Sequence, residues 1–271
     1  MAAKAKTKQR RHGLIDFLVM AFKINMQSVM EYRLNFIILA FGMFLNDVAF
    51  LVFWIIVYGK FHTINGWGFN NIILLQAIIT IGWGFASFFL GNWNRIADIV
   101  SKGALDYYLT LPKPVLLHLL VTRSSFAGVG DMLFGLVLGT YALSSTISSI
   151  PLFILLIVLS TIILISFGVV IGSLIFFIGG QGELQETLQT SLLLLSTYPF
   201  SIFGGAAKIL LLIAIPVGFI TGVPVLILNN FNPLYLGYMF IATAASAIVA
   251  YAVFRFGLRR YESGNAINVQ I

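Results

Sequence analysis

The chain has 271 residues, of which 59% are hydrophobic and only 9% are charged, and its mean hydropathy is +0.99. This composition excludes a soluble globular domain and indicates an integral membrane protein. The absence of cysteine excludes disulfide bonds, thiolate catalysis and cysteine metal sites. The formal net charge is +7, but the basic residues lie at the ends of apolar runs, so membrane topology explains them better than nucleic-acid binding does.

The chain begins with a basic tail, residues 1–13, followed by an amphipathic segment, residues 14–33. The tail does not lead into the compact apolar core of a cleavable signal peptide, so we expect it to stay in the cytoplasm. On a helical wheel the segment carries an apolar stripe of Ile15, Leu18, Phe22, Met26 and Val29, and a polar stripe of Asp16, Lys23, Gln27 and Glu31. This pattern predicts a helix lying in the cytoplasmic membrane interface.

Several later runs are long enough to cross a hydrocarbon core of about 30 Å and are apolar on every side, which predicts helices and not a β-barrel. We expect six transmembrane helices, at Phe36–Tyr58, Ile72–Leu90, Val115–Leu143, Leu152–Ile178, Leu188–Phe203 and Leu236–Phe256. The predicted fold class is therefore an all-α membrane protein. Its six-span domain covers residues 34–257, and residues 258–271 form a cytoplasmic tail.

One further apolar segment, Ile209–Leu228 within residues 205–230, is long enough to cross but is broken by Pro216 and Pro224. Proline removes helix hydrogen bonds that lipid cannot replace. An even number of crossings keeps the C-terminal arginines on the same cytoplasmic side as the N-terminal basic tail. We therefore interpret the segment as a broken, re-entrant hairpin before the last span, with an ordinary kinked seventh span as the alternative.

The sequence lacks the motifs of several enzyme classes. No stretch fits the P-loop pattern G-x-x-x-x-G-K-[ST], and no G-x-S-x-G nucleophile elbow is present. The three histidines lie in different regions without metal-ligand spacing. We expect no enzyme activity, no metal and no cofactor in this chain.

A charged stretch, residues 91–114, separates the second and third spans on the predicted cytoplasmic side. Asn92 or Asn94 can cap a short helix, Gly103 can end it, and Pro112 and Pro114 bias the return away from helix. We expect an apolar side of this helix to face a soluble partner, although a solvated loop is the alternative. The predicted docking residues are Arg95, Ile96, Ile99, Val100, Lys102, Gly103, Asp106 and Pro112.

The sequence GALDYYLTLP, Gly103 to Pro112, resembles the G-x-L-D-x-x-L-x-x-P signature that follows the second span in one branch of type-2 ATP-binding-cassette exporter permeases. The stretches YPFSIF, Tyr198 to Phe203, and LRRYESG, Leu258 to Gly264, are similar to the same branch, so the resemblance extends over essentially the whole chain. It implies six spans, an interfacial N-terminal helix and a re-entrant hairpin. It also implies that the loop after span two is the coupling helix, which seats in a cleft of a separate ATPase subunit.

The expected function is that of a transmembrane permease subunit of an ATP-driven exporter, which moves a lipid-like, drug-like or peptide substrate outward. The resemblance implies two copies of an ATPase subunit, which bind the ATP and Mg²⁺, and a second permease, identical or related. We expect the complex in the cytoplasmic membrane, in contact with lipids and not with nucleic acid, with both termini cytoplasmic. The alternatives are an ion-coupled secondary transporter and a non-transporting membrane scaffold.

Three charged residues fall inside predicted spans, where charge is costly and indicates structural pairing or function. Asp47 lies near the middle of the first span, and Arg123 and Asp131 lie in the third. Similar depths predict that Asp47 and Arg123 form an intramembrane pair, and Asp131 is a candidate cavity residue. A structural pair, substrate contact and proton coupling are the alternative roles.

The predicted topology places Lys60 and Lys208 outside and Lys102 and Arg260 inside. Single cysteines introduced at these positions should react with a membrane-impermeant maleimide in intact cells only at 60 and 208. Labelling at 260 would contradict the even number of crossings and favour seven spans.

Overall fold

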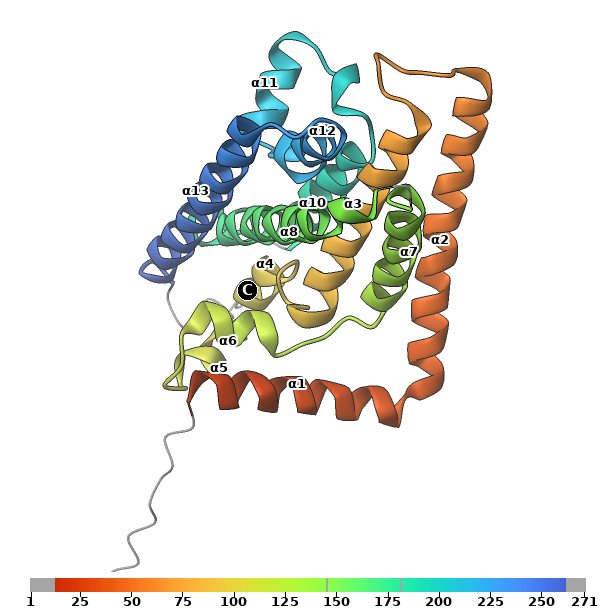
Figure 1. Ribbon diagram of the computed structural model, residues 1–271. Helices are drawn as coiled ribbons and strands as arrows, with labels where there is room; N and C mark the ends of the chain where they lie inside the picture. Colours follow the sequence, from red (N-terminus) through yellow and green to blue (C-terminus); the bar gives the residue numbers. More distant parts are fainter. Residues whose placement is uncertain (1–12, 145, 181, 262–271) are drawn as a thin grey trace, which may run out of the picture.

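The computed structural model describes residues 13–144, 146–180 and 182–261, and these ranges contain helices and no strand (Figure 1). The longer helices are α1 (Leu14–Glu31), α2 (Arg33–Lys60), α3 (Phe69–Phe89), α7 (Ala127–Ala142), α8 (Ile150–Ser173), α10 (Glu183–Ser196) and α13 (Pro233–Leu258). The shorter ones are α4 (Ile96–Ser101), α5 (Leu105–Leu109), α6 (Val115–Val121), α9 (Ile175–Ile178), α11 (Gly205–Ile213) and α12 (Val223–Asn229). Residues 1–12 of the basic tail and 262–271 of the C-terminal tail lie outside the described residues.

Five long helices form a row in which each packs on the next, in the order α2, α7, α3, α8 and α13. Helix α3 is the centre of this bundle, since Ile72, Leu75 and Ile78 are completely buried. Four helical stretches are long and apolar enough to cross a membrane: α2, α3, residues 147–178 and α13. The chain is therefore a multi-pass membrane protein.

Helices α2 and α7 run in the same direction and touch closely. Phe36 packs on Phe126 with ring centroids 5.9 Å apart, and Phe44 packs on Phe134 at 5.7 Å. Between these ring pairs, Gly130 lies so close to the Ala40 carbonyl that a β-carbon would collide with it. Small residues allow this backbone approach, which is how helices associate in a medium where burial in lipid gives no hydrophobic gain.

The predicted third span, Val115–Leu143, is not one helix. Helix α6 ends at Val121, and α7 begins only at Ala127. In the link between them, the Arg123 carbonyl accepts a hydrogen bond from the Gly91 amide at 2.9 Å, and the Ser125 amide donates to the Ser87 carbonyl at 2.8 Å. The end of α3 thus satisfies the backbone of the link, so the helix breaks without leaving these polar groups unpaired.

The predicted fifth span, Leu188–Phe203, is shorter in the structure, because α10 ends at Ser196 and only a single 3₁₀ turn, Phe200–Ile202, follows Pro199. The proline-containing segment after it is interrupted as expected. Helix α11 is separated from a π-helical turn, Gly218–Gly222, which leads directly into α12. The re-entry of this segment into a bilayer, and the count of six spans, stay predictions.

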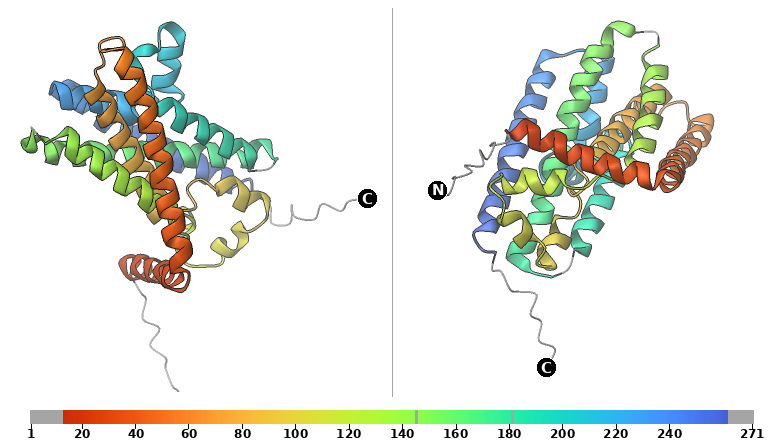
Figure 2. Two further views of the ribbon diagram at one scale, coloured as in Figure 1. Left: turned by 90° about the vertical axis from the view of Figure 1, so that its right-hand side faces the viewer. Right: turned by 90° about the horizontal axis from the view of Figure 1, so that it is seen from below.

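A helix is present where the amphipathic segment predicts one, because α1 extends over Leu14–Glu31 and lies across the end of α2 (Figures 1 and 2). The chain turns between the two helices at Tyr32, whose backbone is not helical. Phe22 of α1 stacks on Phe89 with ring centroids 5.8 Å apart, which ties α1 to the end of α3. The short elements α4, α5 and α6 lie at this same end of the bundle (Figure 1).

The close contact of α2 with α7 predicts opposite effects for two glycine substitutions. Gly130→Ala should destabilise the fold by about 1–3 kcal/mol, because the added methyl group collides with the Ala40 backbone. Gly42→Ala is the matched control, since a β-carbon there meets nothing within 4 Å, and it should stabilise α2 by up to about 1 kcal/mol. The unfolding midpoint in detergent measures the stability of both variants. Equal midpoints for Gly130→Ala and Gly42→Ala would contradict the close packing of α2 on α7.

Candidate functional site

The predicted short helix is present as α4, but its start differs from the prediction. Arg95 is the N-cap residue and makes no side-chain cap. Asn92 instead donates from Nδ2 to the Leu119 carbonyl at 2.9 Å and to Thr122 Oγ1 at 3.1 Å, so it joins the loop to α6. Gly103 adopts φ +69°, a left-handed conformation that glycine reaches without strain, and so terminates α4 as predicted.

The apolar side of α4 faces the helical bundle and not a partner, which corrects the predicted orientation. Ile96 is completely buried, and Ile99 and Val100 are each only 8% exposed. Helix α4 packs on α8 and α9, and Ile96 fills the space over Gly172, where a β-carbon would lie 2.7 Å from the Ile96 side chain. The three residues therefore fix α4 to the bundle.

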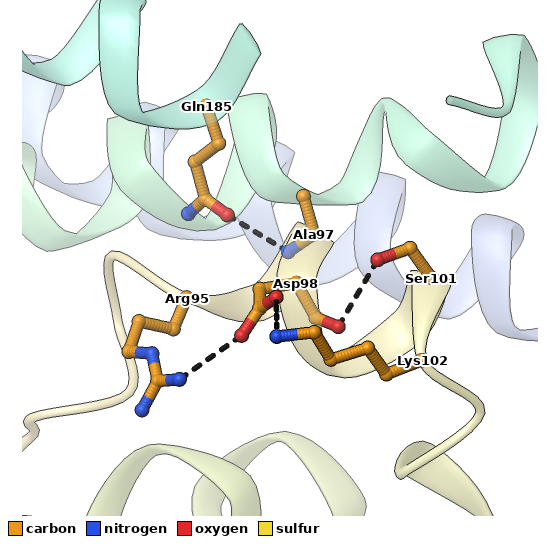
Figure 3. A network of polar contacts seen from close by, with 6 residues as sticks. All are labelled: Arg95, Ala97, Asp98, Ser101, Lys102 and Gln185. Atoms are coloured by element: carbon orange, nitrogen blue, oxygen red, sulfur yellow. Dashed lines mark hydrogen bonds and ion pairs between the residues drawn. The ribbon is translucent and has the colours of Figure 1, made fainter. Parts of the chain in front are cut away.

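A buried glutamine on α10 holds the backbone of the loop (Figure 3). Gln185 accepts a hydrogen bond from the Ala97 amide at 2.8 Å and donates to the Trp93 carbonyl at 3.1 Å and the Gly168 carbonyl at 3.2 Å. Its side chain thus connects the loop, α8 and α10. Sequence reasoning missed Gln185, because the turn GGQGELQET indicates only a solvated connection.

The outward side of α4 carries a small charge network (Figure 3). Asp98 forms ion pairs with Lys102 at 2.6 Å and with Arg95 at 3.0 Å. Hydrogen bonding to Lys102 lowers the pKa of Asp98; burial opposes this effect, and Arg95 adds to it. The carboxylate therefore stays charged at neutral pH, and its pairing is lost only when the pH falls through this lowered pKa.

A polar cavity of about 950 Å³ lies between α4 and the start of α10. Arg95 and Lys102 line one side, and Glu183 and Glu186 line the other. The two predicted basic docking residues therefore face a cavity of mixed charge, and not an isolated basic patch. The glutamates, which the sequence pattern leaves in solvent, belong to the same surface.

The tail after α13 contacts the loop. The Tyr261 hydroxyl donates to the Gly103 carbonyl at 3.4 Å and also hydrogen-bonds the side chain of Asp106. Burial, reinforced by Asp106, raises the pKa of Tyr261 to about 12. The predicted docking residue Asp106 therefore binds the tail. The sequence does not predict this contact, because Asp106 and Tyr261 are far apart in the chain.

The remaining exposed surface of the loop comes from its second half. Tyr107 is 63% exposed, Leu109 is 43% exposed, and Leu111 and the predicted residue Pro112 are also exposed. We call α4 and α5 together with the return to Pro112, residues 96–112, the coupling element. It combines a buried apolar base with an exposed surface that is partly charged and partly apolar.

The predicted pair of Asp47 and Arg123 is not formed, and Asp47 has a different partner. Asp47 and Asp131 interact through their side-chain carboxyl groups. Arg123 is exposed in the link before α7. Helices α2 and α7 are parallel, and Phe36 lies level with Phe126. Arg123, three residues before Phe126, therefore lies near the start of α2, roughly 20 Å along that helix from Asp47.

Asp47 and Asp131 both line a second cavity, of about 580 Å³, formed by side chains of α2, α3, α7 and α10 and by the two residues Thr197 and Tyr198. Asp131 is only 3% exposed, in agreement with its predicted place at a cavity. Oδ1 of Asp131 and Oδ2 of Asp47 have no hydrogen-bond partner among the described residues. Within the same residues, no cluster of histidine, aspartate and glutamate could hold a metal ion.

The comparisons with known proteins identify one family. The model of the ABC-2 family transporter protein matches residues 44–265, which include the coupling element and both intramembrane aspartates. Helix α1 precedes the matched region. No curated protein and no solved structure matches the chain.

The tail contact predicts a measurable pH dependence. Because the pKa of Tyr261 is raised, its contribution to stability is complete below pH about 10 and is lost as the pH rises toward 12. Asp106→Asn should lower the pKa of Tyr261 only part of the way toward its ordinary value, because burial raises this pKa more than Asp106 does. Ultraviolet difference titration against Tyr261→Phe measures the phenolate, with Tyr235→Phe as the control for loss of a tyrosine. A wild-type titration near pH 10 would contradict the contact.

Proposed function

The chain belongs to the ABC-2 family of transporters, and from this membership and the coupling element we propose that it is the permease subunit of an ATP-driven exporter. The family consists of membrane transport components, which normally work with a separate ABC ATPase subunit. Outward transport, and the branch of the family, rest on the resemblance of Gly103–Pro112 to exporter permeases.

The observation that carries the proposal is the bracing of the coupling element. Its apolar base is buried against α8 and α9, Gln185 binds its backbone from α10, and Tyr261, after α13, binds it at Gly103, between α4 and α5. A loop that only connects two spans in solvent does not require three such attachments to the bundle. An element that transmits a conformational change of a partner does require them, because a flexible loop would deform instead of moving the helices.

The surface that remains free suits a protein partner. Exposed apolar side chains of Tyr107 and Leu109 lie in the same short element as the charged residues Asp98 and Lys102, and Arg95 directly precedes it. Protein interfaces typically combine an apolar centre with a polar rim. We assign this exposed surface to the ATPase subunit. Ile96, Ile99 and Val100 are buried against the bundle, so the proposed contact with the ATPase lies on the exposed side of α4 and not on the side that these three residues form.

The complete transporter in this proposal contains two permeases and two ATPase subunits in the cytoplasmic membrane. The ATPase subunits bind ATP and Mg²⁺, and both termini of the permease are cytoplasmic, on the side of the coupling element. Helix α2 has a largely exposed apolar surface, which includes Ile38, Phe41 and Ile56. Lipid and the second permease, identical or related, would cover that surface.

Charge placed on the docking surface should separate binding from folding. Leu109→Asp should reduce co-purification of the ATPase subunit at least about tenfold, because docking would desolvate the new carboxylate. Ile147→Asp, at an exposed apolar position on the opposite side of the predicted topology, is the control and should leave co-purification unchanged.

Pro112→Ala should keep the ATPase bound but reduce transport-stimulated ATP hydrolysis, since the return of the coupling element becomes more flexible. Wild-type ATPase binding and transport in Leu109→Asp would contradict the assignment of the docking surface.

A further inference from the structure

The cavity that holds Asp47 and Asp131 has an unusual charge balance. Both carboxyl groups line it, and no lysine, arginine or histidine is among its described lining residues. Buried carboxylates are costly unless they are paired with a cation or fully hydrogen-bonded. Here they face each other, and one oxygen of each has no partner among the described residues. Two carboxyl groups that hydrogen-bond each other share a proton, so the pair supplies one negative charge to this cavity without a compensating positive group.

The other walls are aromatic and weakly polar. Phe50, Phe53, Trp83 and Tyr198 line the cavity together with the amide side chains of Asn46 and Gln76. Gln76 is itself engaged, since its Nε2 donates to the Thr197 carbonyl at 3.4 Å. Aromatic faces attract organic cations, and the attraction is stronger when water is excluded. An aromatic wall beside an acidic pair is thus suited to a cation with an apolar body.

Position and size fit a transported molecule. Asp47 lies at the middle of α2, so the acidic pair is far from both ends of that helix. A volume of about 580 Å³ falls within the range of cavities that enclose drug-sized ligands. A simple inorganic cation would leave most of this space and its aromatic surface unused.

We propose that Asp47 and Asp131 form the recognition site for an amphiphilic organic cation, which is the substrate class of this permease. The positive centre lies beside the acidic pair, and the apolar body contacts Phe53, Trp83 and Tyr198. This inference rests on the proposed transport function and narrows it, since lipid-like, drug-like and peptide substrates alike must then carry a positive group.

The test uses two probes of matched size and shape and opposite charge, tetraphenylphosphonium and tetraphenylborate. Binding to the purified full-length permease in phosphatidylcholine nanodiscs is measured by equilibrium dialysis, without the ATPase subunit. Wild type should bind the phosphonium and discriminate against the borate. Asp131→Asn and Asp47→Asn should each raise the Kd for the phosphonium at least about tenfold.

Two further variants control for folding and for surface charge. Glu31→Gln removes one exposed carboxylate of α1 and should bind as wild type does. Phe53→Ala should weaken phosphonium binding by removing an aromatic wall, and it keeps the test decisive if an asparagine variant fails to fold. The unfolding midpoint of each variant identifies such a failure.

Equal binding of the two probes, or unchanged phosphonium binding in both asparagine variants, would overturn the inference and leave the aspartates a structural pair. The proposed transport function fails separately, through loss of ATPase association. Binding of the phosphonium to a permease that recruits no ATPase would therefore retain the cation site and reject the exporter.

Discussion

The end of the bundle that carries α4 depends on the hydrogen bonds of one buried side chain, Gln185. Its amide group accepts from the Ala97 amide and donates to the carbonyls of Trp93 and Gly168. Without these bonds the start of α4 would present unpaired backbone groups to a buried environment, which is strongly unfavourable. The position of α4 follows from this clamp, and the burial of Ile96 and Ile99 follows from the position of α4.

The sequence is informative where a single physical rule dominates. Apolar length alone predicts α2, α3 and α13, and amphipathic periodicity predicts α1. Gly103 illustrates a local rule, since glycine at the end of a short helix predicts the left-handed conformation that it adopts. These features depend on residues that are near one another in the chain.

Features that depend on long-range contacts could not be predicted from the sequence. The apolar runs on both sides of the link between α6 and α7 predict one continuous span, but the end of α3 satisfies the backbone of the link, so the predicted third span is broken. The apolar side of α4 predicts a contact, but not whether the partner is the bundle or another protein. Asp47 contacts Asp131 because α2 packs on α7, a relation that no local pattern encodes.

The contact of Tyr261 with Gly103 has a practical consequence for handling the protein. Because Tyr261 contacts Gly103, a domain or affinity tag fused directly after Tyr261 would begin beside the surface assigned to the ATPase subunit. A bulky fusion there would compete for the same space, and an attached bead would restrict access to it. Attachment at Lys60, in the predicted topology on the opposite side of the membrane, leaves that surface open.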